Sequence, residues 1–264
     1  MLRRSLLTFT LVVASAAAAP VELAAQAPAD ADAFDRQDRR ARALIRQVRC
    51  AQHVAGLRQR GVFGPVDSLG GSGQCTVVDG KFVGIFLEPD SQVVRATRFS
   101  AVDLATSTRR TAPIDTAAVL AVLRASWNAQ ERGAPEFEKE NRQYTPMPFR
   151  FDGDSIEVWL FPVAVITGQP LTVGGERGYV YSPDGHTLAR TIDASATWRT
   201  FALADTGVAR IPSDQARTPL LSELVIANVL HGAGHRVLIE MREASAALVG
   251  EGESSVWMHV NAKR

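Results

Sequence analysis

Apolar positions follow a helical period in three segments of the chain. In the first segment, apolar residues recur at spacings of three and four, which places them on one face of a helix. These residues are Ala41, Leu44, Ile45, Val48, Ala51 and Ala55. The pattern predicts an N-terminal helix from residue 34 to about residue 60, with Gly61 as its stop.

Two internal segments carry the start and stop signals of shorter helices. Asp115 or Thr116 can cap the first of them, and Gly133 lies just past its expected end. In the second, Thr218 stands before a proline, which is a common arrangement at a helix start. The apolar segment LLSELVIANVL follows, and Gly232 is its expected end.

Short runs of β-branched and aromatic residues, separated by turn residues, occupy most of the remaining chain. The predicted strands lie within 75–104, 149–165, 179–203, 236–243 and 254–260, and the polar segment 134–149 is predicted to be a loop. Polarity alternates along these runs, which favours antiparallel sheet with one solvated face. We therefore expect an α+β fold in which antiparallel sheet packs against the N-terminal helix and two internal helices.

Three pairs of similar segments occur in the same order along the chain. GIFLEPDSQVV from Gly84 resembles GYVYSPDGHTL from Gly178, PIDTAAVLAVL from Pro113 resembles PLLSELVIANV from Pro219, and DGDSIEVWL from Asp152 resembles EGESSVWM from Glu251. Each match alone is ordinary turn chemistry, so the shared order carries the interpretation. We interpret the chain as two related ββαββ halves, 76–165 and 166–264, preceded by a segment with the N-terminal helix and a glycine-rich loop, 26–75.

The first residues have the layout of a secretory signal peptide. Arg3 and Arg4 precede an apolar run, 5–19, that ends in small side chains and is shorter than the ~20 residues of a membrane span. We expect a signal peptide over 1–25, with cleavage between Ala19 and Ala27, and a secreted or periplasmic protein. The full chain has a net charge of +1, which indicates neither nucleic acid nor an anionic membrane as a partner.

The chain has two cysteines, Cys50 and Cys75. In an exported protein an even pair of cysteines favours a disulfide. The alternative is two free thiols, one of them a nucleophile, but no local motif supplies the partner histidine that such a nucleophile needs. We therefore expect a Cys50–Cys75 disulfide.

The stretch YVYSPDGHTLAR brings Asp184 and His186 close together in the sequence. Residues two apart on a strand point to the same face, so these two side chains could form an acid–base pair. The competing interpretation is a turn, in which Asp184 bonds the backbone ahead of it and Gly185 adopts a positive φ. We favour the turn, because no nucleophile or metal ligand accompanies the pair.

His231 and His235 have the four-residue spacing of helical zinc ligands. Gly232 and Gly234 would weaken a helix between them, and His259 is the third ligand that folding would have to supply. We favour a glycine-rich turn here and expect no metal or other cofactor.

Residues 34–60 contain eight arginines and two aspartates, a local net charge of +6. This segment is either a solvated helix face, which we favour, or a site for an acidic partner or a lipid headgroup. The four tryptophans either line a ligand groove or anchor the core, and we favour the core for the second and fourth of them. They are Trp127, Trp159, Trp198 and Trp257.

No phosphate-binding glycine loop, dinucleotide fingerprint or nucleophile elbow occurs in the sequence. We therefore expect an exported, non-catalytic binding or accessory module. Its ligand, partner and oligomeric state do not follow from the sequence. The alternative is a hydrolase or metal-dependent enzyme that uses His186 or the His231/His235 pair.

Overall fold

The structure is a computed structural model of the whole chain. It describes residues 31–59, 73–78, 81–87, 99–103, 108–109, 115–140, 143–151, 154–162, 171–193, 197–203 and 207–261. The predicted signal peptide and the predicted helix stop at Gly61 lie outside these residues. Within them, no helix combines the length and the apolar character that a membrane span requires.

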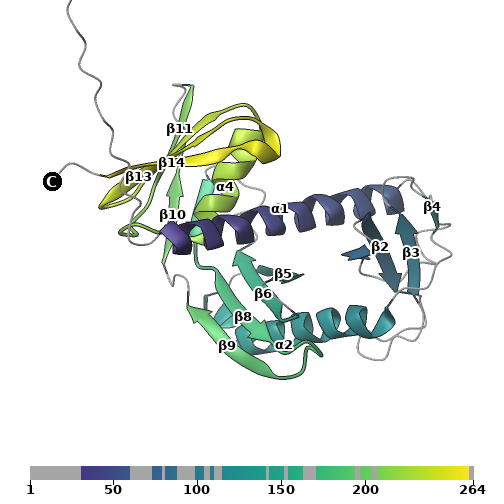
Figure 1. Cartoon of the computed structure of the whole chain (residues 1–264). Helices are drawn as coiled ribbons and strands as arrows, with labels where there is room; N and C mark the ends of the chain where they lie inside the picture. Colours follow the sequence, from purple (N-terminus) through teal and green to yellow (C-terminus); the bar gives the residue numbers. More distant parts are fainter. Residues whose placement is uncertain are drawn as a thin grey trace, which may run out of the picture.

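Three α-helices organise the described chain: α1 (Ala31–Gln59), α2 (Thr116–Glu140) and α4 (Leu221–Gly232). Helix α1 is the predicted N-terminal helix, and its length is about 43 Å at 1.5 Å per residue. Figure 1 shows it running from α4 and the C-terminal sheet at one end to β2 and β3 at the other. Its position makes it the element that connects the two ends of the molecule.

Helix α2 begins as predicted but ends later. The Asp115 carboxylate caps it by accepting the backbone N–H of Ala118 at 3.0 Å. The predicted end at Gly133 is wrong, because the helix continues past this buried glycine and past Pro135 to residue 140. A single glycine costs a helix only about 1 kcal/mol, which tertiary packing outweighs here. The predicted loop 134–149 is therefore the end of α2 followed by a strand.

The strands of the described residues form four sheets. β1 (Gly73–Val78), β2 (Lys81–Leu87), β3 (Phe99–Asp103) and β4 (Thr108–Arg109) are neighbours in this order. The second sheet has the order β5 (Tyr144–Arg150), β6 (Ile156–Pro162), β8 (Arg177–Tyr181) and β9 (Leu188–Asp193). β7 (Leu171–Gly174) pairs with β10 (Trp198–Phe201), and the last sheet has the order β11 (Val208–Pro212), β12 (Arg236–Glu240), β13 (Ala244–Val249) and β14 (Val256–Asn261).

The α+β class is confirmed, with one correction to the expected antiparallel pairing. β11 pairs with β12 in parallel, and α4 is the crossover between these two strands. A parallel pair requires such a crossover, because no short turn can bring the second strand back in the same direction. The sheet that contains β6 and β8 joins strands from both sides of residue 165, so the two halves share a sheet. Their duplication remains a prediction.

Strand β6 is buried along its whole length, so it lacks the solvated face that was expected of the sheets. Ile156, Val158 and Leu160 pack against α2, whose contact residues Ala121, Ala125 and Ala129 are small. Trp159 and Phe161 point to the opposite face and join the core formed with α1 and α4. The expectation that Trp159 anchors the core is confirmed. Covering both faces of one strand explains why the apolar positions of IEVWLF do not alternate.

One of the N-terminal arginines is buried on this second face of β6. Arg40 lies against Glu157, with Nε 3.0 Å from Oε2 and Nη2 3.0 Å from Oε1. The Trp159 indole N–H donates to the same carboxylate at 3.1 Å. The Arg40 guanidinium also lies over the Phe151 ring, 4.8 Å from its centroid. This bidentate pair is fully hydrogen-bonded, so it fixes the position of α1 on the sheet.

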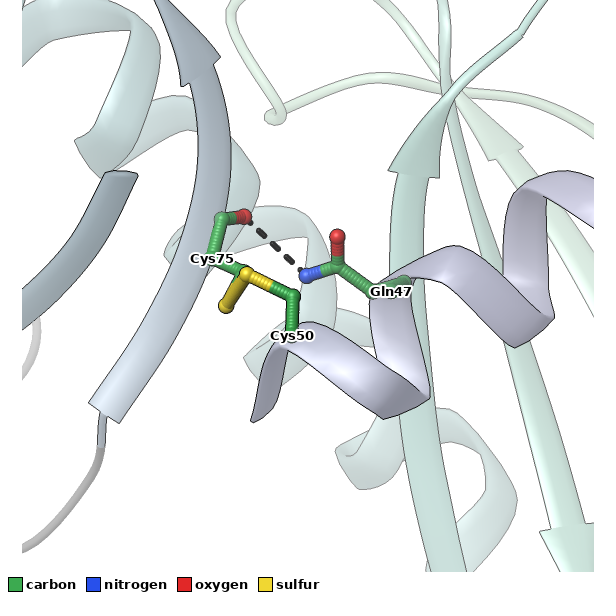
Figure 2. Close-up of a disulfide and its surroundings, with 3 residues drawn as sticks. All are labelled: Gln47, Cys50 and Cys75. Carbon is green, nitrogen blue, oxygen red and sulfur yellow. Dashed lines mark hydrogen bonds between the residues drawn. A yellow bond between two sulfur atoms is a disulfide. The ribbon is translucent and has the colours of Figure 1, made fainter. Parts of the chain in front are cut away.

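The predicted disulfide is present and joins α1 to β1. Cys50 and Cys75 are both buried, and their Cα atoms lie 6.0 Å apart. Next to the bond, the Gln47 amide donates to the Cys75 carbonyl at 3.0 Å (Figure 2). The cross-link therefore holds the first sheet against the C-terminal half of α1.

Candidate functional site: an arginine-lined groove

The Asp184–His186 pair forms a turn between β8 and β9. The Ser182 hydroxyl and the backbone N–H of His186 both donate to Asp184 Oδ1. These two hydrogen bonds, the Ser182 bond first, lower the pKa of the Asp184 carboxyl below its ordinary value. Gly185 has a φ of +76°, as the turn interpretation predicted. The aspartate is therefore engaged in holding the turn.

This turn is also seated on helix α2. Arg124 donates to the Asp184 carbonyl, and Asn128 Nδ2 donates to the Gly185 carbonyl at 3.1 Å. A Cβ atom at Gly185 would lie 2.0 Å from the carbonyl oxygen of Ala121, so only glycine fits here. The His186 side chain is exposed. The stretch therefore attaches the β8–β9 hairpin to α2, which is a structural role.

The three histidines that were weighed as metal ligands do not converge. His231 lies in the last turn of α4, whereas His235 is exposed beyond the end of the helix. His259 is on β14 and packs edge-on against Phe34, with 4.5 Å between ring centroids. Burial lowers the pKa of the His259 imidazole. Within the described ranges no three His, Cys, Asp or Glu side chains are grouped as a metal would require.

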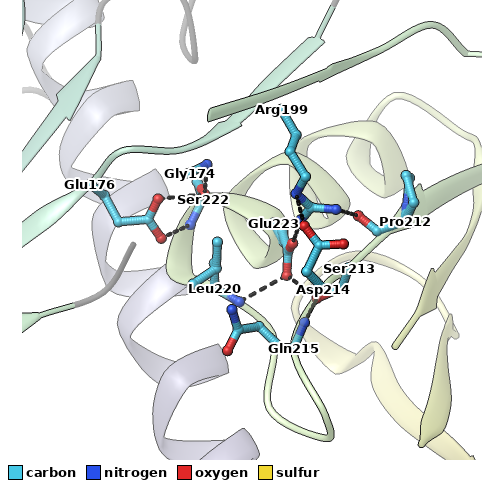
Figure 3. A network of polar contacts seen from close by, with 10 residues as sticks. All are labelled: Gly174, Glu176, Arg199, Pro212, Ser213, Asp214, Gln215, Leu220, Ser222 and Glu223. Atoms are coloured by element: carbon cyan, nitrogen blue, oxygen red, sulfur yellow. Dashed lines mark hydrogen bonds and ion pairs between the residues drawn. The ribbon is translucent and has the colours of Figure 1, made fainter. Parts of the chain in front are cut away.

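Two buried carboxylates meet at the N-terminus of α4 (Figure 3). Glu223 accepts the Leu220 backbone N–H and the Ser213 hydroxyl, each at 2.8 Å, and is paired with Arg199. Glu223 is therefore the residue that caps this helix. The predicted cap at Thr218 is wrong, because the helix begins three residues later, after Leu220.

The second carboxylate, Glu176, comes from the segment between β7 and β8. It accepts the Ser222 hydroxyl at 2.7 Å and the Ser222 backbone N–H at 3.1 Å. The Ser222 oxygen in turn accepts the N–H of Gly174 at 2.9 Å. A serine beside a carboxylate can be a nucleophile with its base, but both side chains are fully buried here. This network therefore stabilises the helix start and offers no access to a substrate.

Burial dominates the ionisation of both carboxyls. It raises the pKa of Glu176, against the lowering effect of its bonds to Ser222. It raises the pKa of Glu223 to about 7, against the lowering effects of Ser213, Leu220 and Arg199. The negative charge of Glu176 adds to the rise at Glu223. The start of α4 is thus a place where the folded protein binds protons near neutral pH.

A groove of about 190 Å³ lies where α1 meets the end of α4 and the turn before β14. Three arginines of α1 line one wall: Arg42, Arg46 and Arg49. The other lining residues are Ile45, Asn228, His231, Gly232, Gly252 and Ser255. No carboxylate is among the described side chains that line the groove, so the wall formed by α1 is positive.

The three arginines differ in how they are held. Arg42 donates to Asp38 Oδ2 at 2.7 Å and to the Ser255 carbonyl at 2.9 Å, so it ties α1 to the strand β14 side of the groove. Arg46 and Arg49 are exposed, and in the part of the chain that the structure describes neither forms an ion pair. Their guanidinium groups are therefore available to an external anion, which they can bind through two parallel hydrogen bonds each.

The opposite wall is shaped by the end of α4. Arg49 Nη2 lies against Gly232, where an added Cβ would be only 3.4 Å from it. His231 Nε2 lies 3.0 Å from the Gly250 carbonyl, which assigns the proton to Nε2 and leaves Nδ1 as an acceptor. His231 Nδ1 is buried and has no hydrogen-bond partner within the described structure. The last α4 carbonyls accept the N–H groups of residues 233–235, so they do not add free negative charge to the groove.

The sequence indicated the charge of this site but not its shape. Its arginines belong to the segment that was interpreted either as a solvated face or as a site for an acidic partner. The structure divides that segment: Arg40 is buried with Glu157, whereas Arg46 and Arg49 face the groove. The rest of the lining comes from residues 228–232 and 252–255, about 190 positions further along the chain. No local sequence pattern predicts that these residues lie beside α1.

Comparisons of the chain with protein-family models, with curated proteins and with solved structures gave no match.

Proposed function

We propose that the protein is an exported, non-catalytic binding module that holds an anionic group of its ligand in the arginine groove. The observation that supports this most is the pair of exposed guanidinium groups, Arg46 and Arg49, in a groove whose described lining residues include no carboxylate. Arginine forks match the planar geometry of carboxylates and the tetrahedral geometry of phosphates. Export rests on the N-terminal sequence and agrees with the disulfide.

The alternative function, an enzyme that uses these histidines, has less support than the binding module. His186 is exposed on a turn, His235 is exposed beyond α4, and His231 bonds a backbone carbonyl. Catalysis by a general base requires a partner within hydrogen-bond reach. No ion pair or hydrogen bond joins these imidazoles to a carboxylate within the described residues.

Calorimetric titration with inorganic phosphate and with succinate tests the proposal. We expect saturable binding of at least one of them to the wild-type protein, with an affinity that falls as salt is added. Arg46→Gln/Arg49→Gln should weaken that binding about tenfold or more, because hydrogen bonds to charged groups contribute about 1.5–3 kcal/mol each.

The matched control removes two arginines elsewhere. Arg36 and Arg190 are exposed, and neither lines the groove. Arg36→Gln/Arg190→Gln lowers the net charge by the same amount and should leave binding unchanged. The proposal fails if neither anion binds, or if both double variants weaken binding equally.

A further inference from the structure

The arginines of the groove belong to a longer cationic stripe on α1. Its members follow one another at spacings of three, four, three and four residues: Arg39, Arg42, Arg46, Arg49 and His53. Residues at these spacings lie above one another on one face of a helix. The stripe is about 21 Å long at 1.5 Å per residue. Only its three middle members line the groove, so the positive surface extends beyond it at both ends.

Among the described residues, few acidic side chains lie near this stripe. Asp38 is engaged by Arg42 and by Asn228 Nδ2, the latter at 3.1 Å. Asp35 is exposed four residues before Arg39, at the N-terminal end of this face, and it also acts on the imidazole of His259 on β14. Glu251 is exposed in the turn after β13 and does not line the groove. The described surface along the stripe is therefore cationic over a distance that a single small anion cannot cover.

The dimensions of the stripe fit an extended chain that carries several anions. An extended polypeptide rises about 3.3 Å per residue, so about six residues match the stripe, and alternate side chains face it about 6.6 Å apart. Successive arginines of the stripe are about 4.5–6 Å apart along the helix axis, which is close to the spacing of those alternate side chains. The groove at the middle of the stripe is hollow, whereas the surface of a bilayer is flat. Along α1 the described aromatic side chain, Phe34, is buried, so no platform for nucleobases accompanies the stripe.

We propose that an extended acidic polypeptide segment of a partner lies along this stripe and places one carboxylate in the groove. The inference rests on the proposed anion-binding function and adds the class of partner. Binding is distributed: the groove holds one carboxylate with Arg46 and Arg49, while Arg39 and His53 contact carboxylates further along the segment. Each exposed contact is weak on its own, because exposed ion pairs contribute about 0.2–1 kcal/mol.

Fluorescence anisotropy with a labelled peptide of alternating Glu and Ser residues, long enough to cover the stripe, tests this inference. We expect the peptide to bind at least tenfold more tightly than succinate. Arg39→Gln and His53→Gln should each weaken peptide binding about two- to fivefold, as expected for exposed pairs. Neither substitution should change the binding of succinate or phosphate, because neither residue lines the groove. The control Arg190→Gln, at an exposed residue of β9 that does not line the groove, should change neither.

The outcomes separate the two proposals. If succinate and phosphate do not bind, the proposed function fails. If they bind but the peptide binds no more tightly, and Arg39→Gln has no effect, the partner class is wrong while the groove remains an anion site. The acidic polypeptide is also wrong if phosphatidylglycerol vesicles or a single-stranded oligonucleotide bind in preference to the peptide. Circular dichroism melts confirm that each exposed-site variant is folded.

Discussion

Replacing Glu223 with Gln should remove much of the dependence of stability on pH. Burial raises the pKa of the folded-state Glu223 carboxyl to about 7, from its ordinary value of 4.5. Between these two values the folded protein holds a proton that the unfolded chain releases. The contribution of Glu223 to the free energy of unfolding is therefore largest below pH 4.5 and is lost as the pH rises through 7.

The size of the effect follows from the shift. One pKa unit corresponds to about 1.36 kcal/mol, so this carboxyl removes about 3 kcal/mol of stability between pH 4.5 and pH 8. Glutamine resembles the protonated carboxyl and does not titrate. Glu223→Gln should therefore match the wild type most closely near pH 4.5, and should gain about 3 kcal/mol relative to it by pH 8. Glu176 is present in both proteins and contributes a fall of the same direction to each.

Urea denaturation at a series of pH values between 4.5 and 8 measures this difference. In thermal melts it corresponds to a relative change of roughly 6–12 °C for a chain of this size. Glu243→Gln, at an exposed residue paired with Arg217, is the control and should preserve the wild-type slope. Parallel pH profiles for the wild type and Glu223→Gln, or a variant that loses stability relative to the wild type from pH 5 to pH 8, would refute the reasoning.

Three further variants test how the turn at Gly185 and the disulfide stabilise the fold. Gly185→Ala should destabilise the protein by about 2–4 kcal/mol, because it combines a positive φ with a clash against the α2 backbone. Gly234→Ala has a positive φ but open space around it, so it should cost only about 1 kcal/mol; equal losses in urea melts would show that the contact with α2 is unimportant. Cys50→Ala/Cys75→Ala should lower the free energy of unfolding by about 3 kcal/mol through loop-closure entropy, and an unchanged urea midpoint would contradict that role.

Features with a local signal could be predicted from the sequence. The period of the apolar residues in α1 is visible because the helix buries Ala41, Leu44 and Ile45 on one face. The Asp115 cap and the bend at Gly185 are similarly local, because a short side chain or a positive φ acts on neighbouring backbone. The disulfide followed from compartment and cysteine number.

Features that depend on distant contacts could not be predicted. The α2 sequence contains two residues that weaken helices, Gly133 and Pro135, yet packing carries the helix through them. The cap of α4 comes from within the helix and from Glu176, about 45 positions earlier, in place of Thr218. The parallel pairing of β11 with β12 is a property of the crossover rather than of either strand. The groove likewise exists only because α1 meets segments from the far end of the chain.

The central claim is that Arg46 and Arg49 bind an anionic group. Solution NMR of the arginine Nε–H signals during a succinate titration tests it most directly. The account predicts saturable shifts of the Arg46 and Arg49 signals at concentrations where those of Arg36 and Arg190 stay unchanged. Unshifted signals, or equal unsaturable shifts of all exposed arginines, would contradict it.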